Sequence, residues 1–600
     1  MPLRPIFPPF KLGALALGLL LAACGGGSGS GPGAPAGNIA GVAAAGLPLV
    51  GVVTVKDALG ATRSVNIGNN GSYSIDVNGM TAPFVFRAEG RAGGREYVLH
   101  SAATAADVGG VINVTPLTDL VVSNIAGEIA QRYFDGQANL GGLTAEALAA
   151  ELAQLRARLL PVLTALGIDA AVDLLRTPFT PLASALDRAI DVLRVDYNAG
   201  SATITNVVTQ QQIMDDLATR AAQETAAQTM DQTGGVAQAG TDIDQIRAAL
   251  SGFSDQFATG VPAVGVLRPR LSADFLFRDS DAETLLADLS TFPDIVGARF
   301  TEVTIRGIDY SNASRLVADV SFVIQSVNGN TVSLERHWKL VKDNNAWLLH
   351  GDQRTLDVEV VAFMNATTYG TGSGQSCRQS GLTLSVEDND GATDNDGGTS
   401  YVIVTGPGIA QVGIRITKPA LGGNFQIDTS ASNGGNGNYY VVASNCGAAV
   451  DLPAVPSIPQ NAVYTFTAYT AGDVPIPAAS YSDTLLARPL TLAETLASTQ
   501  FPTITEPTYA AFSSFGGGAL TVSASGFDPL GSLEFDLRLF NSDGSSSEAR
   551  ADWATPASGL YSATLTVAPP TGAVSIVGRM LEVSNRTQNM RNFDTRYVPQ

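Results

Sequence analysis

The chain has 600 residues, of which 45% are hydrophobic and 15% are charged, and its formal net charge at pH 7 is −20. This length implies roughly three to five domains. The acidic balance argues against nucleic-acid binding, which needs clustered Lys and Arg, and against adsorption to anionic lipid through surface charge.

The first 23 residues have the layout of a secretory signal peptide, in which a basic start precedes an apolar run of about a dozen residues. That run is too short for a spanning helix, which needs about 20 residues. The ending "LAAC" resembles a bacterial lipobox. The resemblance implies cleavage before Cys24, acylation of Cys24 and a membrane-lipid partner, and Gly25 after the cysteine favours the outer membrane. The alternative is an ordinary secreted protein with a stray cysteine. Residues 24–37 are then the lipidated cysteine and a Gly/Ser-rich flexible tether.

Residues 38–122 read as short strands. "GSYSIDV" alternates Tyr73, Ile75 and Val77 with polar residues, and Asn70-Gly71 is a hairpin turn signal. With "IAGVAAAGLPLVGVVTVKDALG" before it and "NVTPLTDLVV" after it, this stretch resembles a carboxypeptidase-regulatory-like domain, which implies a transthyretin-like β-sandwich. The resemblance does not bring peptidase activity, because the chain has three histidines and no H-x-x-E or H-E-x-x-H motif.

Residues 123–235 predict a helical region that also contains a β-hairpin. In "TAEALAAELAQLRARLLPVLTALG", leucines from Leu148 to Leu166 recur every three or four residues and define one apolar helical face. Thr144 is the expected N-cap, and Pro161 is expected to kink or divide the helix. The leucine face fits a local helical bundle, with a partner-binding helix as the alternative. A hairpin is expected at Asn198-Ala-Gly200.

Residues 241–366 predict two helices followed by long strands, with hairpin turns at Asn328-Gly329 and Asn344-Asn345. This order resembles the α+β cone of the nuclear-transport-factor-2-like family, whose curved sheet surrounds a cavity. Some relatives use a buried Asp or Tyr as acid or base.

The resemblance makes Asp309 and His337 the candidate catalytic residues for proton transfer, with Tyr310 beside Asp309. The interpretation that the pattern favours is a solvated outer face that carries His337, above a core of Trp338, Leu340 and Trp347, because no residue spacing here demands chemistry.

Two all-β sandwiches are expected in the last third of the chain, over 377–490 and 500–600, because strand-like runs alternate with turn residues. The second resembles an immunoglobulin-like or fibronectin-type-III sandwich. Cys377 and Cys446 form an even pair once Cys24 is lipidated, so an exported protein is expected to join them in a disulfide. Two free buried thiols are the alternative.

An acidic stretch, "EDNDGATDNDGG", raises the question of calcium. Its four aspartates, Asp388, Asp390, Asp394 and Asp396, carry carboxylates, a donor type that calcium favours. Their spacing does not follow the EF-hand rule, and an exposed hairpin tip of this composition needs no metal. No other cofactor is expected.

The sequence therefore predicts a multi-domain, mainly-β protein with a helical segment, arranged as β-sandwich, helical bundle, α+β cone and two β-sandwiches. The function it favours is a lipid-anchored, non-enzymatic binding or scaffolding module of the cell envelope. An envelope protein or a glycan is the expected partner. The alternative is a lipid-anchored enzyme that uses the pocket of residues 241–366.

Overall fold

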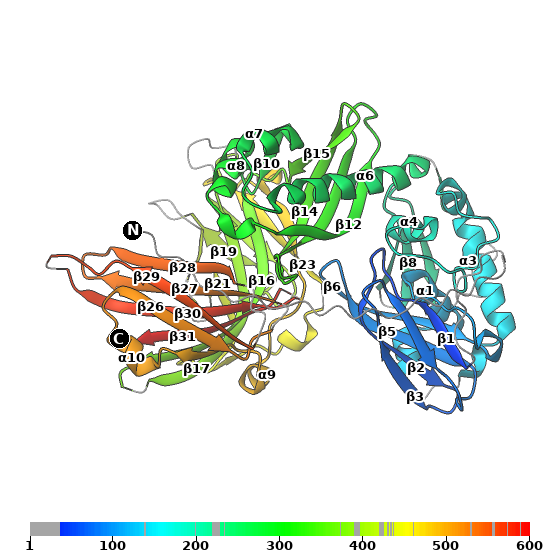
Figure 1. Ribbon diagram of the computed structural model, residues 1–600, viewed down its shortest axis with the longest axis horizontal. Helices are drawn as coiled ribbons and strands as arrows, with labels where there is room; N and C mark the ends of the chain where they lie inside the picture. The colour runs from blue at the N-terminus through cyan, green and yellow to red at the C-terminus, as the bar shows by residue number, and fades with distance from the viewer. Residues whose placement is uncertain are drawn as a thin grey trace, which may run out of the picture.

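The computed structural model of the protein is mainly β and consists of three units. It describes residues 37–136, 140–198, 200–218, 228–232, 235–372, 374–388, 396–418, 425–428, 431–432, 435, 437–459, 461–528, 531–554, 559–572, 574–588 and 590–599. We call 37–218 the N-terminal unit, 235–351 the central unit and 357–599 the C-terminal unit. The central unit lies between the other two, at the top of the view in Figure 1.

The N-terminal unit is a small strand sandwich with helices on one side. Its elements are β1 (Asn38–Val42), β2 (Val50–Asp57), β3 (Thr62–Asn66), β4 (Ser72–Asp76), β5 (Phe84–Ala92), β6 (Arg95–Ala103), α1 (Pro116–Ala126), α2 (Ala130–Asp135), α3 (Ala145–Ala165), α4 (Ala185–Val192), β7 (Leu193–Asn198), β8 (Ser201–Asn206) and β9 (Gln212–Asp216). Strands β1 and β4 form one sheet, and β3-β2-β5-β6 form the other. On β4, Tyr73 and Ile75 are buried and the three polar residues are exposed, as the alternation predicts.

Helix α1 begins inside the range 38–122, which the sequence assigned to strands. Thr115 caps the helix because its hydroxyl accepts a hydrogen bond from the Thr118 amide at 3.2 Å, and Pro116 occupies the first turn. Leu120 and Val121 on this helix are fully buried. The "TPLTDLVV" segment is therefore a helix that packs on β6.

Helix α3 has the predicted N-cap and apolar face. The Thr144 hydroxyl accepts from the Ala147 amide at 3.1 Å, and Leu155, Leu159 and Leu163 are fully buried. Pro161 lies inside α3 and does not divide it. The predicted hairpin at 198–200 joins β7 to β8, and β9 extends it to three strands.

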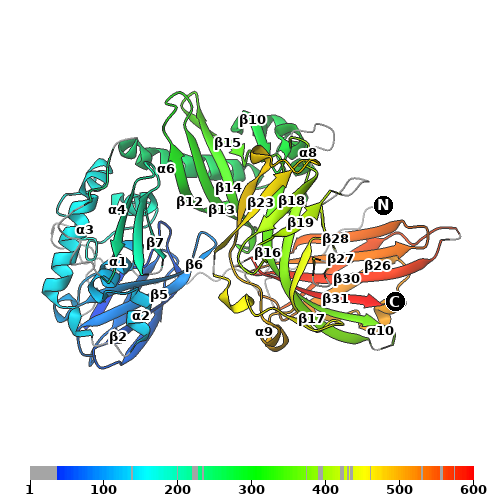
Figure 2. The same ribbon diagram turned by 180° about the vertical axis from the view of Figure 1, so that it is seen from behind.

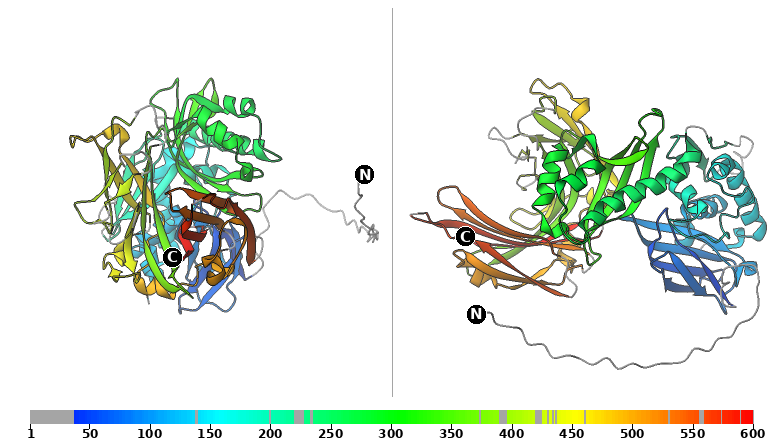
Figure 3. Two further views of the ribbon diagram at one scale, coloured as in Figure 1. Left: turned by 90° about the vertical axis from the view of Figure 1, so that its left-hand side faces the viewer. Right: turned by 45° about the horizontal axis from the view of Figure 1, so that its top comes forward.

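The central unit is a six-stranded sheet with helices packed against it. Its elements are α6 (Val236–Ser254), α7 (Val264–Leu267), β10 (Leu271–Phe277), β11 (Ser280–Asp281), α8 (Ala282–Ser290), β12 (Arg299–Asp309), β13 (Val317–Gln325), β14 (Thr331–Asp343) and β15 (Ala346–Gly351). The strand order is β11-β10-β15-β14-β13-β12, and α6 lies along the sheet in the right-hand view of Figure 3. Turns form at both predicted Asn dipeptides, where Gly329, Asn344 and Asn345 adopt positive φ. Trp338, Leu340 and Trp347 belong to the core, as expected.

The C-terminal unit starts with a strand that the sequence had placed in the cone. Strand β16 (Asp357–Gly370) does not join the central sheet; it pairs with β17 (Gln375–Glu387) and, in parallel, with the last strand, β31 (Asn592–Pro599). The predicted domain 241–366 therefore ends its sheet at Gly351. Residues 360–365 of β16 are all buried, and a buried run of this kind has the same sequence pattern in either sheet. Its partner strand is therefore not visible in the sequence.

One eight-stranded sheet runs through both predicted C-terminal sandwiches, in the order β22-β21-β17-β16-β31-β30-β27-β28. The other elements are β18 (Tyr401–Thr405), β19 (Ile414–Thr417), β20 (Gln426–Ile427), β21 (Tyr439–Ser444), β22 (Val450–Asp451), β23 (Ala462–Tyr469), β24 (Tyr481–Leu485), α9 (Leu492–Ala497), β25 (Thr503–Glu506), α10 (Tyr509–Ser513), β26 (Gly518–Ser525), β27 (Ser532–Asn541), β28 (Ser546–Ala554), β29 (Leu560–Val567) and β30 (Ile576–Arg586).

Two smaller sheets cover different parts of the eight-stranded sheet. The five-stranded sheet β20-β19-β18-β23-β24, seen from behind in Figure 2, shares one hydrophobic core with β16, β17 and β21. The three-stranded sheet β25-β26-β29 shares another core with β27 and β30. The two predicted sandwiches have separate hydrophobic cores, and the structure adds that their sheets are continuous through the pairing of β16 with β31.

A disulfide joins Cys377 to Cys446, as predicted, with the two Cα atoms 5.0 Å apart. Cys377 lies on β17, and Cys446 follows β21, its neighbour in the sheet. The bond closes a loop with a sequence separation of 69 residues.

Replacing both cysteines by serine is expected to lower the free energy of unfolding of the C-terminal unit by about 4 kcal/mol, because the unfolded chain regains the entropy of the closed loop. Urea denaturation followed by circular dichroism measures the loss. Wild-type protein reduced with dithiothreitol should unfold at the same urea concentration as the double variant. Equal midpoints for oxidised and reduced wild type would contradict the prediction.

Candidate functional site

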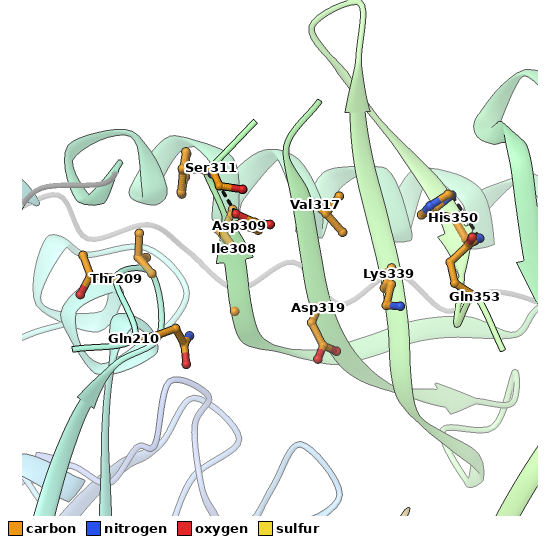
Figure 4. A pocket seen from close by; sticks show the side chains of 13 residues that line it. Thr209, Gln210, Ile308, Asp309, Ser311, Val317, Asp319, Lys339, His350 and Gln353 are labelled. Atoms are coloured by element: carbon orange, nitrogen blue, oxygen red, sulfur yellow. Dashed lines mark hydrogen bonds between the residues drawn. The ribbon is translucent and has the colours of Figure 1, made fainter. Parts of the chain in front are cut away.

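A groove of about 860 Å³ lies between the β8–β9 turn and the outward face of the central sheet. Figure 4 shows Thr209 and Gln210 of the turn on one side, with Asp319 and Lys339 on the strands opposite. Val208 and Val317 supply apolar lining. The central sheet contributes polar side chains to the groove, because side chains alternate along a strand and every second residue of β12, β13 and β14 faces away from the core.

The groove carries both signs of charge. Asp309 and Asp319 line it together with Lys339, and Gln210 and Gln353 contribute side-chain amides. Burial raises the pKa of Asp319, while Arg306, whose Nε lies 3.7 Å from the carboxylate, opposes that rise. The groove therefore offers hydrogen-bond donors and acceptors side by side above an apolar floor.

Asp309, one of the two catalytic candidates, lies in this groove. Its carboxylate accepts a hydrogen bond from the Ser311 amide at 2.8 Å. Hydrogen bonds from Ser311 lower the pKa of Asp309, so the group is an exposed carboxylate at neutral pH. A general base that works near neutrality needs the opposite shift.

Tyr310 is held by a buried carboxylate. Its hydroxyl donates to Asp242 of α6 at 2.8 Å, and the same carboxylate accepts from Lys342 at 2.6 Å and from the indole of Trp347 at 3.3 Å. Asp242 is fully buried. Burial and the Asp242 carboxylate both raise the pKa of Tyr310, so the residue attaches α6 to the sheet as a neutral phenol.

His337, the other catalytic candidate, lies at the contact between the central and C-terminal units. Its Nε2 is 3.3 Å from Asp483 of β24, and its side chain is 21% exposed. The expectation of a solvated outer face was wrong at this position, because β24 covers it. Burial lowers the pKa of His337, and the hydrogen bond to Asp483 only partly offsets that effect.

Asp309 and His337 do not form a pair. Asp309 is aligned with Val317 and Val341 across β13 and β14, whereas His337 lies four residues before Val341. At about 3.3 Å per residue and about 4.8 Å per strand, the two backbones are roughly 16 Å apart. Direct proton transfer between the two side chains has no geometric support.

His350 lines the groove, although no sequence pattern singled it out. Its Nδ1 lies 2.8 Å from the Ser272 hydroxyl and 3.5 Å from Asp274. Burial lowers the pKa of His350, although Asp274 opposes the shift. The ring is therefore neutral at pH 7 and is held by its neighbours. Its position on β15, in the last hairpin of the sheet, was the one sequence feature that could have pointed to a place near the groove.

The remaining predicted site residues lie elsewhere. Cys24, Asp390 and Asp394 are outside the described residues. Asp388 pairs with Lys418, and Asp396 accepts from the Gly398 amide at 2.9 Å. Among the described residues, no group of three or more His, Cys, Asp or Glu side chains is placed to hold a metal ion. Calcium binding by the full acidic stretch stays a prediction.

No protein-family model and no curated protein sequence matches the chain. Among solved structures, the chain is compared with a tetra-tandem repeat in the extending region of a large adhesion protein, at 11% identity over 94% of this chain and 98% of that one, with a TM-score of 0.13. Protocadherin Gamma B2 extracellular cadherin domains 3–6 give 8% identity over 48% of this chain and 58% of that one, with a TM-score of 0.11. At these scores neither likeness carries an argument about fold or function.

None of the helices in the described part of the chain combines the length and the apolar character needed to cross a membrane.

The Asp483 carboxylate is the centre of the contact between the central and C-terminal units. It lies 3.1 Å from Arg336, and it accepts from the Val360 amide at 2.8 Å. Burial alone raises the pKa of Asp483, but Arg336, His337 and the Val360 amide outweigh it and bring the pKa to about 2. Asp483 is 2% exposed, so little solvent screens these interactions.

Asp483→Asn is expected to lower the free energy of unfolding at pH 7 by about 2 kcal/mol, the equivalent of a carboxyl pKa lowered from 3.8 to about 2. A lowered pKa stabilises the folded state fully above pH 4, and this contribution is lost as the pH falls from about 4 to about 2. Urea denaturation followed by tryptophan fluorescence should therefore show a difference between variant and wild type that is large at pH 7 and smaller at pH 3.

Asp255→Asn is the matched control, because Asp255 and its partner Arg299 have side chains that are 55% and 63% exposed. It should change stability by less than about 1 kcal/mol. A loss in Asp483→Asn that is the same at both pH values would contradict the assigned charge state.

Proposed function

We propose that this protein is a lipid-anchored, non-enzymatic binding module of the cell envelope, with an envelope glycan as the ligand of its groove. The open groove of about 860 Å³ on the central sheet carries this proposal. Its volume is in the range of ligand sites, and it joins apolar lining to a small set of polar groups.

A hydroxyl-rich ligand suits these groups. Carboxylates such as Asp309 accept hydrogen bonds, Lys339 donates them, and the Gln210 amide does both. A peptide that bound by strand addition would need an open sheet edge. The edge strand β12 has the β8–β9 turn beside it, where the Val207 carbonyl lies 3.5 Å from the position of a Cβ on Gly307.

The attachment part of the proposal rests on "LAAC" at residues 21–24. Each methylene of an acyl chain on Cys24 that is buried in the bilayer stabilises membrane binding by about 0.8 kcal/mol. Several acyl chains on one residue therefore hold a protein to a bilayer durably. The acidic balance of the chain gives the protein no electrostatic attraction to anionic lipid, which leaves the anchor as the means of attachment.

The glycan proposal predicts that Lys339→Ala and Asp309→Ala each weaken binding at least tenfold, because each removes a polar contact from the groove. The probes are neutral hexasaccharides of glucose and of N-acetylglucosamine, titrated into the purified chain by calorimetry. Glu548→Ala is the matched control, since Glu548 lies on β28 of the C-terminal unit. Chromatography of the mixture after prolonged incubation should return the intact hexasaccharide.

Two results would overturn the glycan proposal. One is binding that neither groove variant changes, and the other is conversion of the sugar to products. Conversion that persisted in Asp309→Ala would also exclude Asp309 as the catalytic group.

The anchor proposal predicts that protein from its native membrane fraction begins at Cys24 and carries the mass of acyl chains. Intact mass spectrometry of wild type and of Cys24→Ser measures this. The variant is expected to lose both the added mass and the membrane association. Unmodified wild-type protein in the soluble fraction would contradict the anchor while leaving the groove proposal standing.

A further inference from the structure

A second cavity, of about 370 Å³, lies where the three units meet. The β5–β6 hairpin and β7 of the N-terminal unit form one wall, and β12 and β14 of the central unit form another. Thr484 and Leu486 close it from the C-terminal unit. Its volume lies within the range of small-molecule sites.

A glycine pair lets the β5–β6 hairpin reach this position. Gly93 and Gly94 adopt positive φ, at 58° and 70°. A Cβ on Gly93 would lie 2.6 Å from the Thr304 hydroxyl, and one on Gly94 would lie 2.7 Å from the Leu334 side chain. Only glycine allows both the turn and the close approach, and the turn places Arg95 at the cavity.

Arginines from four elements line the cavity, namely Arg95 of β6, Arg194 of β7, Arg306 of β12 and Arg336 of β14. Arg336 is paired with Asp483 at 3.1 Å. Arg194 pairs with Asp196 at 2.8 Å, where both side chains are about half exposed. Arg306 has its carboxylate partner, Asp319, only at 3.7 Å. No carboxylate of the described residues lies within 4.0 Å of Arg95, whose side chain bonds to Tyr97.

The buried acids at this cavity are bonded to other groups. Asp191 lies 3.0 Å from Arg247 through each of its carboxylate oxygens. Asp119 accepts from the His100 amide at 2.8 Å and lies 2.7 Å from the His100 ring. Glu96 and Asp196 also line the cavity, and Asp196 is paired with Arg194. Arg306 has Asp319 at 3.7 Å and donates to the Arg336 carbonyl, so Arg95 is the arginine of this lining that has no carboxylate of the described residues within 4.0 Å.

Mutual repulsion among the arginines is consistent with this arrangement. Burial lowers the pKa of Arg306, Asp319 opposes that change, and the positive charges of Arg95 and Arg194 lower the pKa further. A guanidinium stays charged in proteins, so the repulsion persists until an anion enters. An oxyanion between the forks would relieve it and accept paired N–H bonds.

We propose that this cavity binds a small molecule that carries an oxyanion group, a carboxylate, sulfate or phosphate, between Arg95 and Arg306. The site is separate from the groove, although Arg306 of the cavity and Asp319 of the groove face each other on neighbouring strands.

Calorimetric titration of the purified chain with glucuronate, inorganic phosphate and glucose tests the proposal. Glucuronate and phosphate should bind saturably and more weakly as sodium chloride rises, whereas any heat from glucose should not depend on salt. Tighter binding of glucuronate would identify an acidic sugar as the ligand type, and tighter binding of phosphate a free or phosphate-borne oxyanion.

Arg95→Gln is expected to weaken anion binding at least tenfold, and Arg95→Lys less, because lysine keeps the charge and loses the fork. Arg306→Gln provides a second variant from another unit. Arg63→Gln is the matched control, since Arg63 lies on β3, pairs with Asp76 at 3.1 Å and is outside the cavity. Lys339→Ala should leave anion binding unchanged, which separates this site from the groove.

The proposal is overturned if neither anion binds saturably to the wild type. It is equally overturned if Arg95→Gln and Arg306→Gln, both with wild-type melting temperatures, bind glucuronate and phosphate as tightly as the wild type does.

Discussion

The parallel pairing of β16 with β31 is the contact on which the C-terminal half of the molecule depends. The two strands are aligned from Phe363 opposite Asn592 to Gly370 opposite Pro599. Strand β16 follows the central unit directly, and β31 is the last strand of the chain, so this pairing closes a segment of more than 200 residues. Because β16 also pairs with β17 and β31 also pairs with β30, the pairing fuses two sandwiches into one sheet. Backbone groups of β16 and β31 would otherwise be left at open edges, which invite association with other chains.

The same sheet holds the central unit in place. The Asp483 carboxylate on β24 pairs with Arg336 and contacts His337, both on β14. It also accepts a hydrogen bond from the Val360 amide on β16. A charge buried in this way is costly to leave unpaired, so the contact favours one orientation of the two units. At the other side, the glycine turn of the β5–β6 hairpin brings the N-terminal unit against Thr304 and Leu334. These contacts fix the relative positions of the walls of both cavities.

The groove and the cavity differ in their electrostatic character, although both lie along the outward face of the central sheet. The groove combines Asp309 and Asp319 with Lys339 and is open, which suits a neutral polymer that bonds through hydroxyl groups. The cavity gathers arginines from separate units and suits a compact anion. In a chain of net charge −20, the arginines of the cavity lining come together through the way the units meet, not through composition.

The sequence by itself determined what depends on neighbours along the chain. The alternation around Tyr73, the asparagine turns, the Thr144 cap of α3 and the pairing of the only two cysteines outside the first 24 residues follow from local geometry or from simple counting. It also placed Asp309 on the strand that borders the groove. It misplaced the surroundings of His337, because its partner Asp483 is 146 residues away.

The tertiary structure decided which strands pair and which charges meet. A hydrophobic strand such as β16 has the same sequence pattern in any buried sheet. The sequence therefore does not reveal that β16 belongs to the C-terminal unit and not to the central unit. Arg95, Arg194 and Arg306 converge for the same reason, since each lies on a different element and only the packing of the units brings them together. Secondary structure is set largely by short-range preferences, whereas both candidate binding sites are made from contacts between residues distant in sequence.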